Sequence, residues 1–248
     1  MRKINLILTL IVVSLLLLSA ASIAFAQTTK KTLEVPEFKG IYVNSGYTVM
    51  LKQTNKQEVV VEALTEIFEV SEFKVENGIL MINVERKPET TNKSIWAKID
   101  DIKLNPSMKV YISMKNVTEL QVNGAGKIMS ENSISADQLT LGVSGSGSMD
   151  VDIKGNGVKA EVSGAGSLTL RGYATSVNAV VSGAGSIKAF DCPLETATIK
   201  VSGSGNADFN VSTTADAFVH GTGNIKLKGN TKTLGKKVYG TGTVERAY

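Results

Sequence analysis

The chain has 248 residues, of which 42% are hydrophobic and 6% aromatic, and its formal net charge is +4 at pH 7. Without Arg2 and Lys3, which precede an apolar leader, 25 basic residues stand against 23 acidic ones, and this balance with so few aromatic rings argues against nucleic-acid binding. One cysteine, Cys192, and one histidine, His220, exclude an intrachain disulfide and a Cys/His metal cluster.

The first 26 residues have the layout of a secretory signal peptide. A short basic start is followed by the apolar run Ile4–Leu18 and by Ala24-Phe25-Ala26, which places small residues before a cut after Ala26. We therefore predict a signal peptide over residues 1–26, with export to the periplasm, the outer-membrane surface or the extracellular space. A retained anchor is the alternative, because this run is long enough to span a bilayer. No later run is, so we expect no transmembrane segment after cleavage.

Residues 27–115 form an atypical β region, which we expect to close the first end of the fold. Its expected elements follow from alternating apolar residues and turn signals. They are a strand–corner–strand unit over Gly40–Leu51 with the corner at Asn44-Ser45-Gly46, a strand at Glu58–Glu62, a short helix or irregular cap within Ala63–Phe73, a turn at Asn77-Gly78, a strand at Ile79–Val84, a loop at Lys87–Lys93 and a strand at Lys109–Met114.

Residues 116–248 contain seven Gly-x-Gly pairs at a nearly constant interval. The steps between their first glycines are 21, 19, 19, 20, 18 and 19 residues, which indicates a repeat architecture. The pairs are Gly124/Gly126, Gly145/Gly147, Gly164/Gly166, Gly183/Gly185, Gly203/Gly205, Gly221/Gly223 and Gly240/Gly242.

Apolar residues alternate with polar ones on both sides of each glycine pair, so the flanking segments are strands rather than helices. Each repeat then predicts one coil of a parallel β-solenoid, stacked on its neighbours at ~4.8 Å, with two short strands around the Gly-x-Gly corner and a second turn. Glycine suits a crowded corner because it has no Cβ and tolerates positive φ. At one such corner we expect Val181 to point inward, Ser182 outward and Gly183 to exclude a side chain. Serines precede four of the pairs, and they should form a ladder along one edge: Ser144, Ser163, Ser182 and Ser202.

Three stretches resemble the family of putative auto-transporter adhesins with a head GIN domain, which is widespread in Bacteroidetes. They are Phe38-Lys-Gly-Ile-Tyr-Val-Asn-Ser-Gly46, Leu120-Gln-Val-Asn-Gly-Ala-Gly126 and the later Val-Ser-Gly-Ser/Ala-Gly copies. The resemblance covers nearly all of the chain after residue 26. It implies a right-handed parallel β-helix in a secreted or envelope location, and it brings no catalytic residues and no cofactor.

Several side chains invite a chemical interpretation beside a structural one. Asp150, Asp152 and Asp208 suit a calcium or acid/base site, or are solvated outward charges, and Asp100-Asp101 is similar. Cys192 is a buried filler or a nucleophile, and His220 a surface residue or a catalytic one. A set of lysines near the C-terminus either protects a sheet edge or binds an anionic glycan or lipid: Lys226, Lys228, Lys232, Lys236 and Lys237.

We therefore predict a non-enzymatic β-solenoid of the envelope that is structural or adhesive, with an envelope protein or glycan as its partner, and no catalytic, cofactor or metal residues. A carbohydrate-active enzyme on the same scaffold is the first alternative, and it requires a cleft with clustered acidic and basic side chains. A periplasmic accessory protein that adds a partner strand to a free solenoid end is the second.

Overall fold

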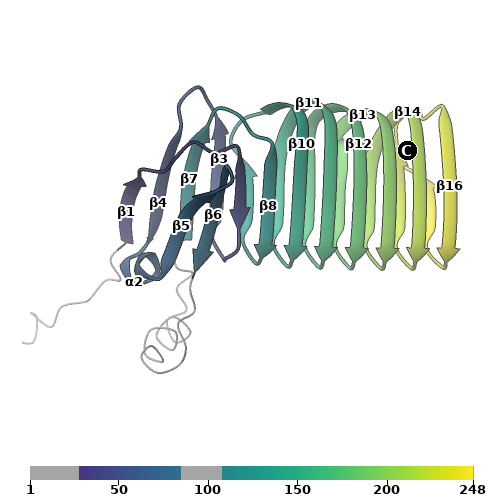
Figure 1. Cartoon of the computed structure of the whole chain (residues 1–248). Coiled ribbons are helices and arrows are strands. Elements are labelled where there is room, and N and C mark those ends of the chain that lie inside the picture. The colour runs from purple at the N-terminus through teal and green to yellow at the C-terminus, as the bar shows by residue number, and fades with distance from the viewer. Residues whose placement is uncertain (1–27, 85–107, 248) are drawn as a thin grey trace, which may run out of the picture.

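A computed structural model describes residues 28–84 and 108–247, and in these residues the chain winds into a β-solenoid (Figure 1). All the described strands belong to one 17-stranded sheet. This confirms the predicted fold class, with parallel coils that follow the spacing of the glycine pairs and an atypical N-terminal region. The predicted signal peptide, the loop at Lys87–Lys93 and Asp100-Asp101 lie outside the described residues.

The regular coils follow the glycine pairs. Their strands are β8 (Glu119–Gly124), β9 (Lys127–Ser130), β10 (Ile134–Gly145), β11 (Ser148–Gly164), β12 (Ser167–Gly183), β13 (Ser186–Gly203), β14 (Asn206–Gly221), β15 (Asn224–Lys228), β16 (Thr233–Gly240) and β17 (Thr243–Arg246). Neighbouring coils pair in parallel, with first glycine beside first glycine, as in Gly145↔Gly164 and Gly164↔Gly183.

The second turn of each coil differs from our expectation. We predicted a break between two short strands, but β11 to β14 each run through the bend as one strand of 16 to 18 residues. The pairing shifts between β12, β13 and β14 all fall in the stretch from Thr169 to Thr196, near this bend. Coils of slightly different length can therefore stack because the bend absorbs the difference, while the corners stay in register.

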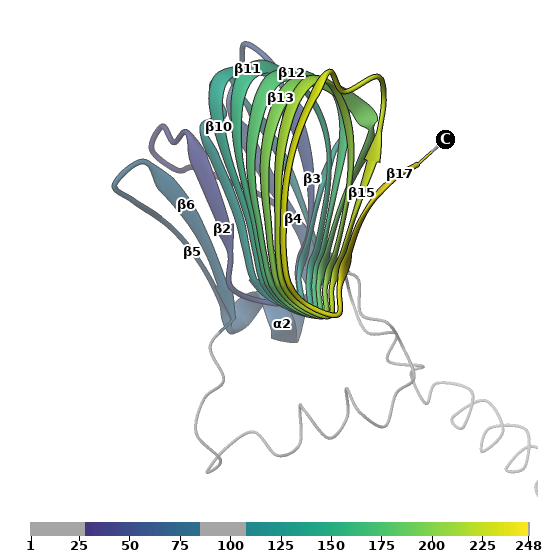
Figure 2. The same ribbon diagram turned by 90° about the vertical axis from the view of Figure 1, so that its right-hand side faces the viewer.

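The bend and the corner divide each coil into two walls, which we name wall A and wall B. Wall A holds the half of each long strand that leads into a glycine corner, together with β8 and β16. Wall B holds the half that leaves it, together with β9, β15 and β17. The walls converge at the glycine corners and separate toward the bend (Figure 2). Inward side chains of both walls fill the space between them, as the fully buried Val181, Ile187 and Phe209 illustrate. Ser182 lies on the outer side of wall A, partly exposed.

The N-terminal region adds two coils in an order that differs from the chain. β2 (Gly40–Val43) pairs in parallel with β8 on one side and with β6 (Ile79–Val84) on the other. β3 (Thr48–Gln53) lies likewise between β9 and β7 (Met108–Met114). The coil formed first in the sequence is thus sandwiched between a later segment and the glycine repeat.

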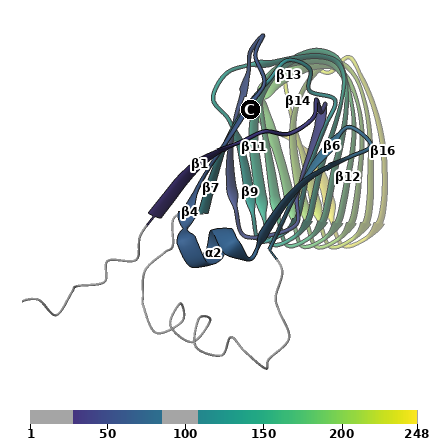
Figure 3. The same ribbon diagram turned by 60° about the vertical axis from the view of Figure 1, so that its left-hand side comes forward.

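Antiparallel strands close this end of the stack (Figure 3). β5 (Ser71–Glu76) pairs with β6, β4 (Glu58–Leu64) pairs with β7, and β1 (Thr28–Leu33) pairs with β4. The helix expected within Ala63–Phe73 is the short α2 (Thr65–Glu69). Asn77 and Gly78 both have positive φ, 51° and 76°, and make the predicted two-residue turn between β5 and β6.

At the other end, β16 and β17 are paired on one side only, with β14 and β15 of the preceding coil, in the part of the chain that the structure describes. Val238 is 39% exposed there, whereas Val219, its counterpart one coil earlier, is 1% exposed. Lys236 follows Ala217 in the inward register and is exposed. This charge at an inward position suits a sheet edge that faces water.

Candidate functional site: a polar groove on wall A

The first glycine of every pair has the backbone conformation that we expected of a corner. Its φ lies between 100° and 131°, in the left-handed region that disfavours other residues. These glycines are Gly124, Gly145, Gly164, Gly183, Gly203, Gly221 and Gly240. The first position therefore requires glycine for its conformation, and at every copy except Gly124 an added Cβ would also lie within 2.8 Å of the carbonyl oxygen of the preceding first glycine.

The second glycine of each pair departs from that expectation, because none of the seven has a positive φ. These glycines are Gly126, Gly147, Gly166, Gly185, Gly205, Gly223 and Gly242. A Cβ added at each of them would lie 2.5–2.7 Å from a valine Cγ1 of the neighbouring coil. At Gly185, for example, it would lie 2.5 Å from Val162 Cγ1. Tolerance of positive φ thus explains only the first position, and the second position is glycine because a side chain has no space there.

The first corner in the chain lacks this glycine pair. Its register places Ser45 beside Gly124, Gly46 beside Ala125 and Tyr47 beside Gly126. Tyr47 is fully buried, its hydroxyl lies 2.8 Å from Ser71 Oγ, and its ring packs edge-on against Phe73 at 5.7 Å. The position of the second glycine thus accepts a large ring where the cap, and not a regular coil, lies beside it.

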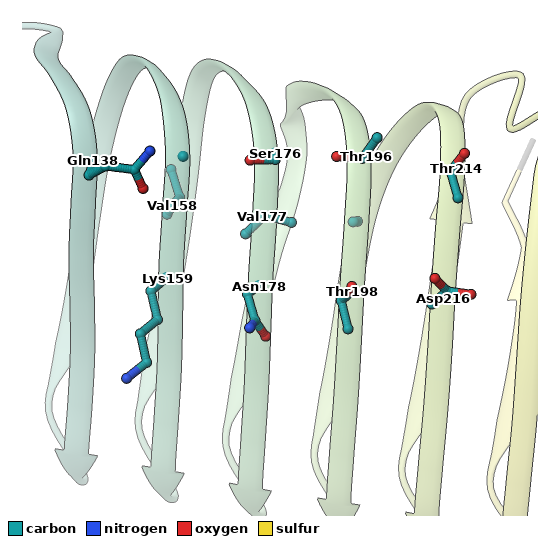
Figure 4. A pocket seen from close by; sticks show the side chains of 12 residues that line it. Gln138, Val158, Lys159, Ser176, Val177, Asn178, Thr196, Thr198, Thr214 and Asp216 are labelled. Carbon is teal, nitrogen blue, oxygen red and sulfur yellow. The ribbon is translucent and has the colours of Figure 1, made fainter.

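A groove with a volume of about 360 Å³ crosses wall A near the bend, over β10 to β14. Two outward rows line it, at the positions seven and five residues before the first glycine of each coil (Figure 4). Their side chains come from Gln138, Lys159, Ser176, Asn178, Thr196, Thr198, Thr214 and Asp216. Gly157 takes one place in the first row, and the amide of Gln138 lies over it. Hydroxyls and amides therefore dominate the groove.

Most polar side chains of the groove have no partner within the described residues, whereas several asparagines elsewhere on the surface are hydrogen-bonded to one another. Among the described residues, hydrogen bonds join Asn44 to Asn83 and Asn123, each at 2.8 Å, and Asn206 to Asn224 at 3.2 Å. In the groove, Ser176 donates to the carbonyl of Asn156 at 3.2 Å. The remaining seven polar side chains of the two rows have no hydrogen bond or ion pair to any described part of the protein. Their donors and acceptors are thus available to a ligand.

Two further hollows extend the groove toward the N-terminal end. One of about 490 Å³ shares Gln138 with it and reaches Lys39 and Asn116. The next, of about 390 Å³, shares Lys39 and Asn116 and reaches Glu37, Asn77 and Lys115. The three hollows form one track along the solenoid, and the carboxylates that line it are Glu37, Asp137 and Asp216, at separate places.

Asp150, Asp152 and Asp208, which the sequence singled out, lie on wall B. Asp150 forms an ion pair with Arg171 of the next coil. Asp208 lies between Lys188 and Lys226 in the register of wall B; burial raises the pKa of its carboxyl, and Lys226 and Lys188 act in the opposite direction. Asp152 accepts nothing from the described side chains, and its backbone N–H donates to Ser130 Oγ at 2.8 Å. These carboxylates are thus outside the groove.

Cys192 is fully buried at the bend of β13, and burial raises its pKa to about 12, with a smaller contribution from Asp152. His220 stands in the outward register of Ser202 on wall A, where its ring centroid lies 6.3 Å from that of Tyr239. In residues 28–84 and 108–247, no group of three or more His, Cys, Asp or Glu side chains is arranged to hold a metal ion.

The C-terminal lysines do not form one patch. Lys226 and Lys228 lie on β15 in wall B, Lys236 and Lys237 lie on β16 in wall A, and Lys232 lies in the connection between these strands. All five are exposed. Sequence reasoning missed the groove residues, although the glycine alignment already placed amides and hydroxyls at the same two outward positions.

Comparison with known proteins decides the family. The profile described as "Putative auto-transporter adhesin, head GIN domain" matches residues 37–231. The chain belongs to this family. No curated protein matches it. The matched segment of the head GIN domain includes β2, the wall A groove and six of the seven glycine pairs.

Crystal structures of other proteins share the head GIN fold of this chain. A putative adhesin from Bacteroides fragilis has a TM-score of 0.77 and 20% identity, covering 90% of this chain and 98% of that one. A putative adhesin from Parabacteroides distasonis has a TM-score of 0.66 and 22% identity, covering 90% and 98%. A putative lipid binding protein, also from Parabacteroides distasonis, has a TM-score of 0.69 and 20% identity, and the match covers 90% of this chain and 97% of that one. In the described residues of this chain, no helix has the length and apolar character needed to cross a membrane.

Proposed function

We propose that this protein is an exported, non-enzymatic adhesion module that binds a glycan through the groove of wall A. The observation that carries the proposal is the set of seven polar groove side chains without a partner among the described residues. Hydroxyl and amide groups in an open groove suit the hydroxyl groups of a sugar. The description of the family and the names of two similar structures support adhesion.

A lipid is a weaker match to the same groove. An acyl chain is stabilised by removing apolar surface from water, so it needs an apolar lining. The side chains that project over the groove are hydroxyls, amides, one ammonium and one carboxylate, while Val158 and Val177 point inward and are buried. The name of the lipid-binding relative therefore does not alter the proposed ligand class for this chain.

Binding is tested by applying residues 27–248 to arrays of bacterial and host glycans. We expect retention on a subset of glycans, reduced by the double variant Asn178→Ala/Thr198→Ala. The matched control is Thr169→Ala/Ser186→Ala, which removes two outward hydroxyls from wall B, away from the groove. Failure to bind any glycan, or equal loss in both double variants, would contradict the proposal.

Catalysis is tested on the glycans that are retained. A carbohydrate-active enzyme would release new reducing ends or unsaturated products during incubation, and we expect neither. Product that disappears with Asp216→Asn would show that the protein is an enzyme and not an adhesion module, since Asp216 is the carboxylate that lines the groove over β10 to β14.

Export is the second part of the proposal, and its basis is the signal-like sequence of residues 1–26. N-terminal sequencing of the protein recovered from an envelope fraction should give Gln27 as the first residue. Recovery of the uncut chain from the cytosol would contradict export, and recovery of the uncut chain from a membrane fraction would favour the retained anchor.

A further inference from the structure

We infer that the ligand of the groove is an uncharged, extended glycan chain that lies along the solenoid axis, with about one sugar residue on each coil. This inference rests on the proposed function and adds the class, the direction and the spacing of the ligand. Four features of wall A lead to it.

The first feature is continuity. The three hollows share lining residues, so the track passes from Glu37 through Lys39, Asn116 and Gln138 to Asp216. Because each coil contributes a neighbouring strand, a track that passes from β10 to β14 runs across the strands and along the stack. A single sugar would occupy only a small part of it, whereas a chain can fill its length.

The second feature is the repeat of the contacts. Ser176, Thr196 and Thr214 are neighbours in the pairing register, and so are Asn178, Thr198 and Asp216. Neighbouring strands are ~4.8 Å apart, which is close to the length of one sugar in an extended β-1,4-linked chain. Equivalent hydroxyl groups of successive sugars can therefore meet equivalent side chains of successive coils.

The third feature is the pair of rows. The two rows are two residues apart along each strand, or ~6.6 Å at the usual rise. The residue between them points inward and is buried, as Val177 and Ala197 are. One chain lying between the rows can then be hydrogen-bonded on both edges, which favours a flat, ribbon-like chain over a coiled or branched one.

The fourth feature is charge. The groove over β10 to β14 has one cation, Lys159, and one anion, Asp216, at opposite ends of the row that contains Asn178 and Thr198. Along the whole track three lysines, Lys39, Lys115 and Lys159, are matched by three carboxylates, Glu37, Asp137 and Asp216, so a polyanionic chain would meet as many negative charges as positive ones. Phe218 follows Asp216 at the next outward position of β14 and is half-buried, so it offers an aromatic face for a sugar at that end.

The test is calorimetric titration of residues 27–248 with neutral β-1,4-linked oligosaccharides of increasing length: the cello-, xylo- and chito-oligosaccharide series from disaccharide to hexasaccharide. At least one series should bind, with the tetrasaccharide about tenfold tighter than the disaccharide, as expected for about 1.4 kcal/mol of added contact. A further gain at the hexasaccharide is expected because the second hollow adjoins Gln138.

Variants of the protein test where the glycan chain lies. Thr196→Arg places a long side chain in the middle of the groove and should abolish the gain with length, while Lys188→Ala on wall B should leave it unchanged. Thermal unfolding of each variant checks that the fold is retained. If Thr196→Arg fails to fold, the smaller change Thr198→Ala serves, with an expected loss of affinity of about threefold to tenfold.

The outcomes separate this inference from the proposed function. Retention of glycans on the array without any gain in affinity with length, or preference for a polyuronate over every neutral series, would overturn the extended neutral chain and leave the adhesion module intact. If none of the three neutral oligosaccharide series binds in calorimetry, the inference is also overturned. An array without any bound glycan would overturn both.

Discussion

A Cβ placed on Gly183 would lie 2.7 Å from the carbonyl oxygen of Gly164, the equivalent glycine of the neighbouring coil. The same oxygen accepts hydrogen bonds from the backbone N–H groups of Ala184, at 2.9 Å, and Gly185, at 2.8 Å. At this corner one carbonyl oxygen thus joins the two coils through two hydrogen bonds, and there is no room for a side chain beside it. The corner residues of the repeat can therefore be tested one by one.

Gly183→Val should destabilise the fold. Valine disfavours the φ of 105° at this position, and its branched side chain would displace the carbonyl of Gly164. We expect a loss of about 1–3 kcal/mol in the free energy of unfolding, measured with urea. Ser182→Val is the control, since Ser182 lies on the outer side of wall A and is partly exposed, and its effect should be small. Equal stability of Gly183→Val and the wild type would show that the corner tolerates side chains.

Gly126→Ala and Gly46→Ala should differ in their effect on thermal stability, although neither glycine has a positive φ. A Cβ on Gly126 would meet the carbonyl oxygen of Ser45 at 2.6 Å and Val43 Cγ1 at 2.7 Å, while a Cβ on Gly46 has nothing within 4 Å. Gly126→Ala should lower the midpoint of thermal unfolding by several degrees. Gly46→Ala should leave the midpoint unchanged or raise it, because alanine restricts the unfolded chain. A similar decrease in both variants would mean that crowding does not explain the second glycine.

Cys192 should not react with thiol reagents in the folded protein at pH 8. Its thiol is fully buried, and burial raises its pKa from 9.0 to about 12, so the reactive thiolate is scarce. The raised pKa also favours the folded state at neutral pH, and this contribution is lost as the pH rises from about 9 toward 12. A coloured disulfide reagent should react rapidly in denaturant and slowly without it. The control is Ser204→Cys in a Cys192→Ala background, whose exposed thiol should react at once in the native state.

Tyr42 should ionise at an unusually high pH. Its hydroxyl donates to Glu119 Oε1 at 2.5 Å, and this hydrogen bond, then burial and the negative charge of Glu119, raise its pKa from 10.0 to about 12. Because the neutral phenol is favoured in the folded state, the stabilisation is complete below pH 10 and is lost as the pH rises through 12.

Ultraviolet titration of the wild type against Tyr42→Phe isolates this phenol. Glu119→Gln should move its ionisation back toward pH 10, whereas Glu161→Gln, an exposed change on the same wall, should have no effect. An ionisation near pH 10 in the wild type would mean that the Tyr42–Glu119 hydrogen bond is not formed in solution.

The repeat could be predicted in detail because its signal is local. One glycine pair sets one corner, and aligning the pairs gives the pairing found between coils, such as Val162↔Val181. The strand at Ile79–Val84 and the turn at Asn77-Gly78 are found as predicted, because alternation and turn chemistry also act within a few residues.

Three features could not be predicted from the sequence. The stacking of β2 between β6 and β8 depends on partners far apart in the chain, for which no short pattern exists. The continuous bend depends on pairing between coils, while Gly155 and Gly172 look like breakers by themselves. The groove depends on which polar side chains lack partners, and Asn178 in the groove looks the same in sequence as Asn206, which has one.

The displaced position of the β2–β3 coil has a consequence for how the chain folds. Each coil of the glycine repeat contacts the coil that directly precedes it in the sequence, so these coils can add one after another. Gly40, in contrast, meets Glu119 across the whole of the remaining N-terminal region. Contacts of such high contact order form slowly, because the intervening loop must be closed first. The N-terminal coils should therefore set the overall folding rate. Removing the coil of β16 and β17 should change that rate little, since this coil joins through local contacts alone.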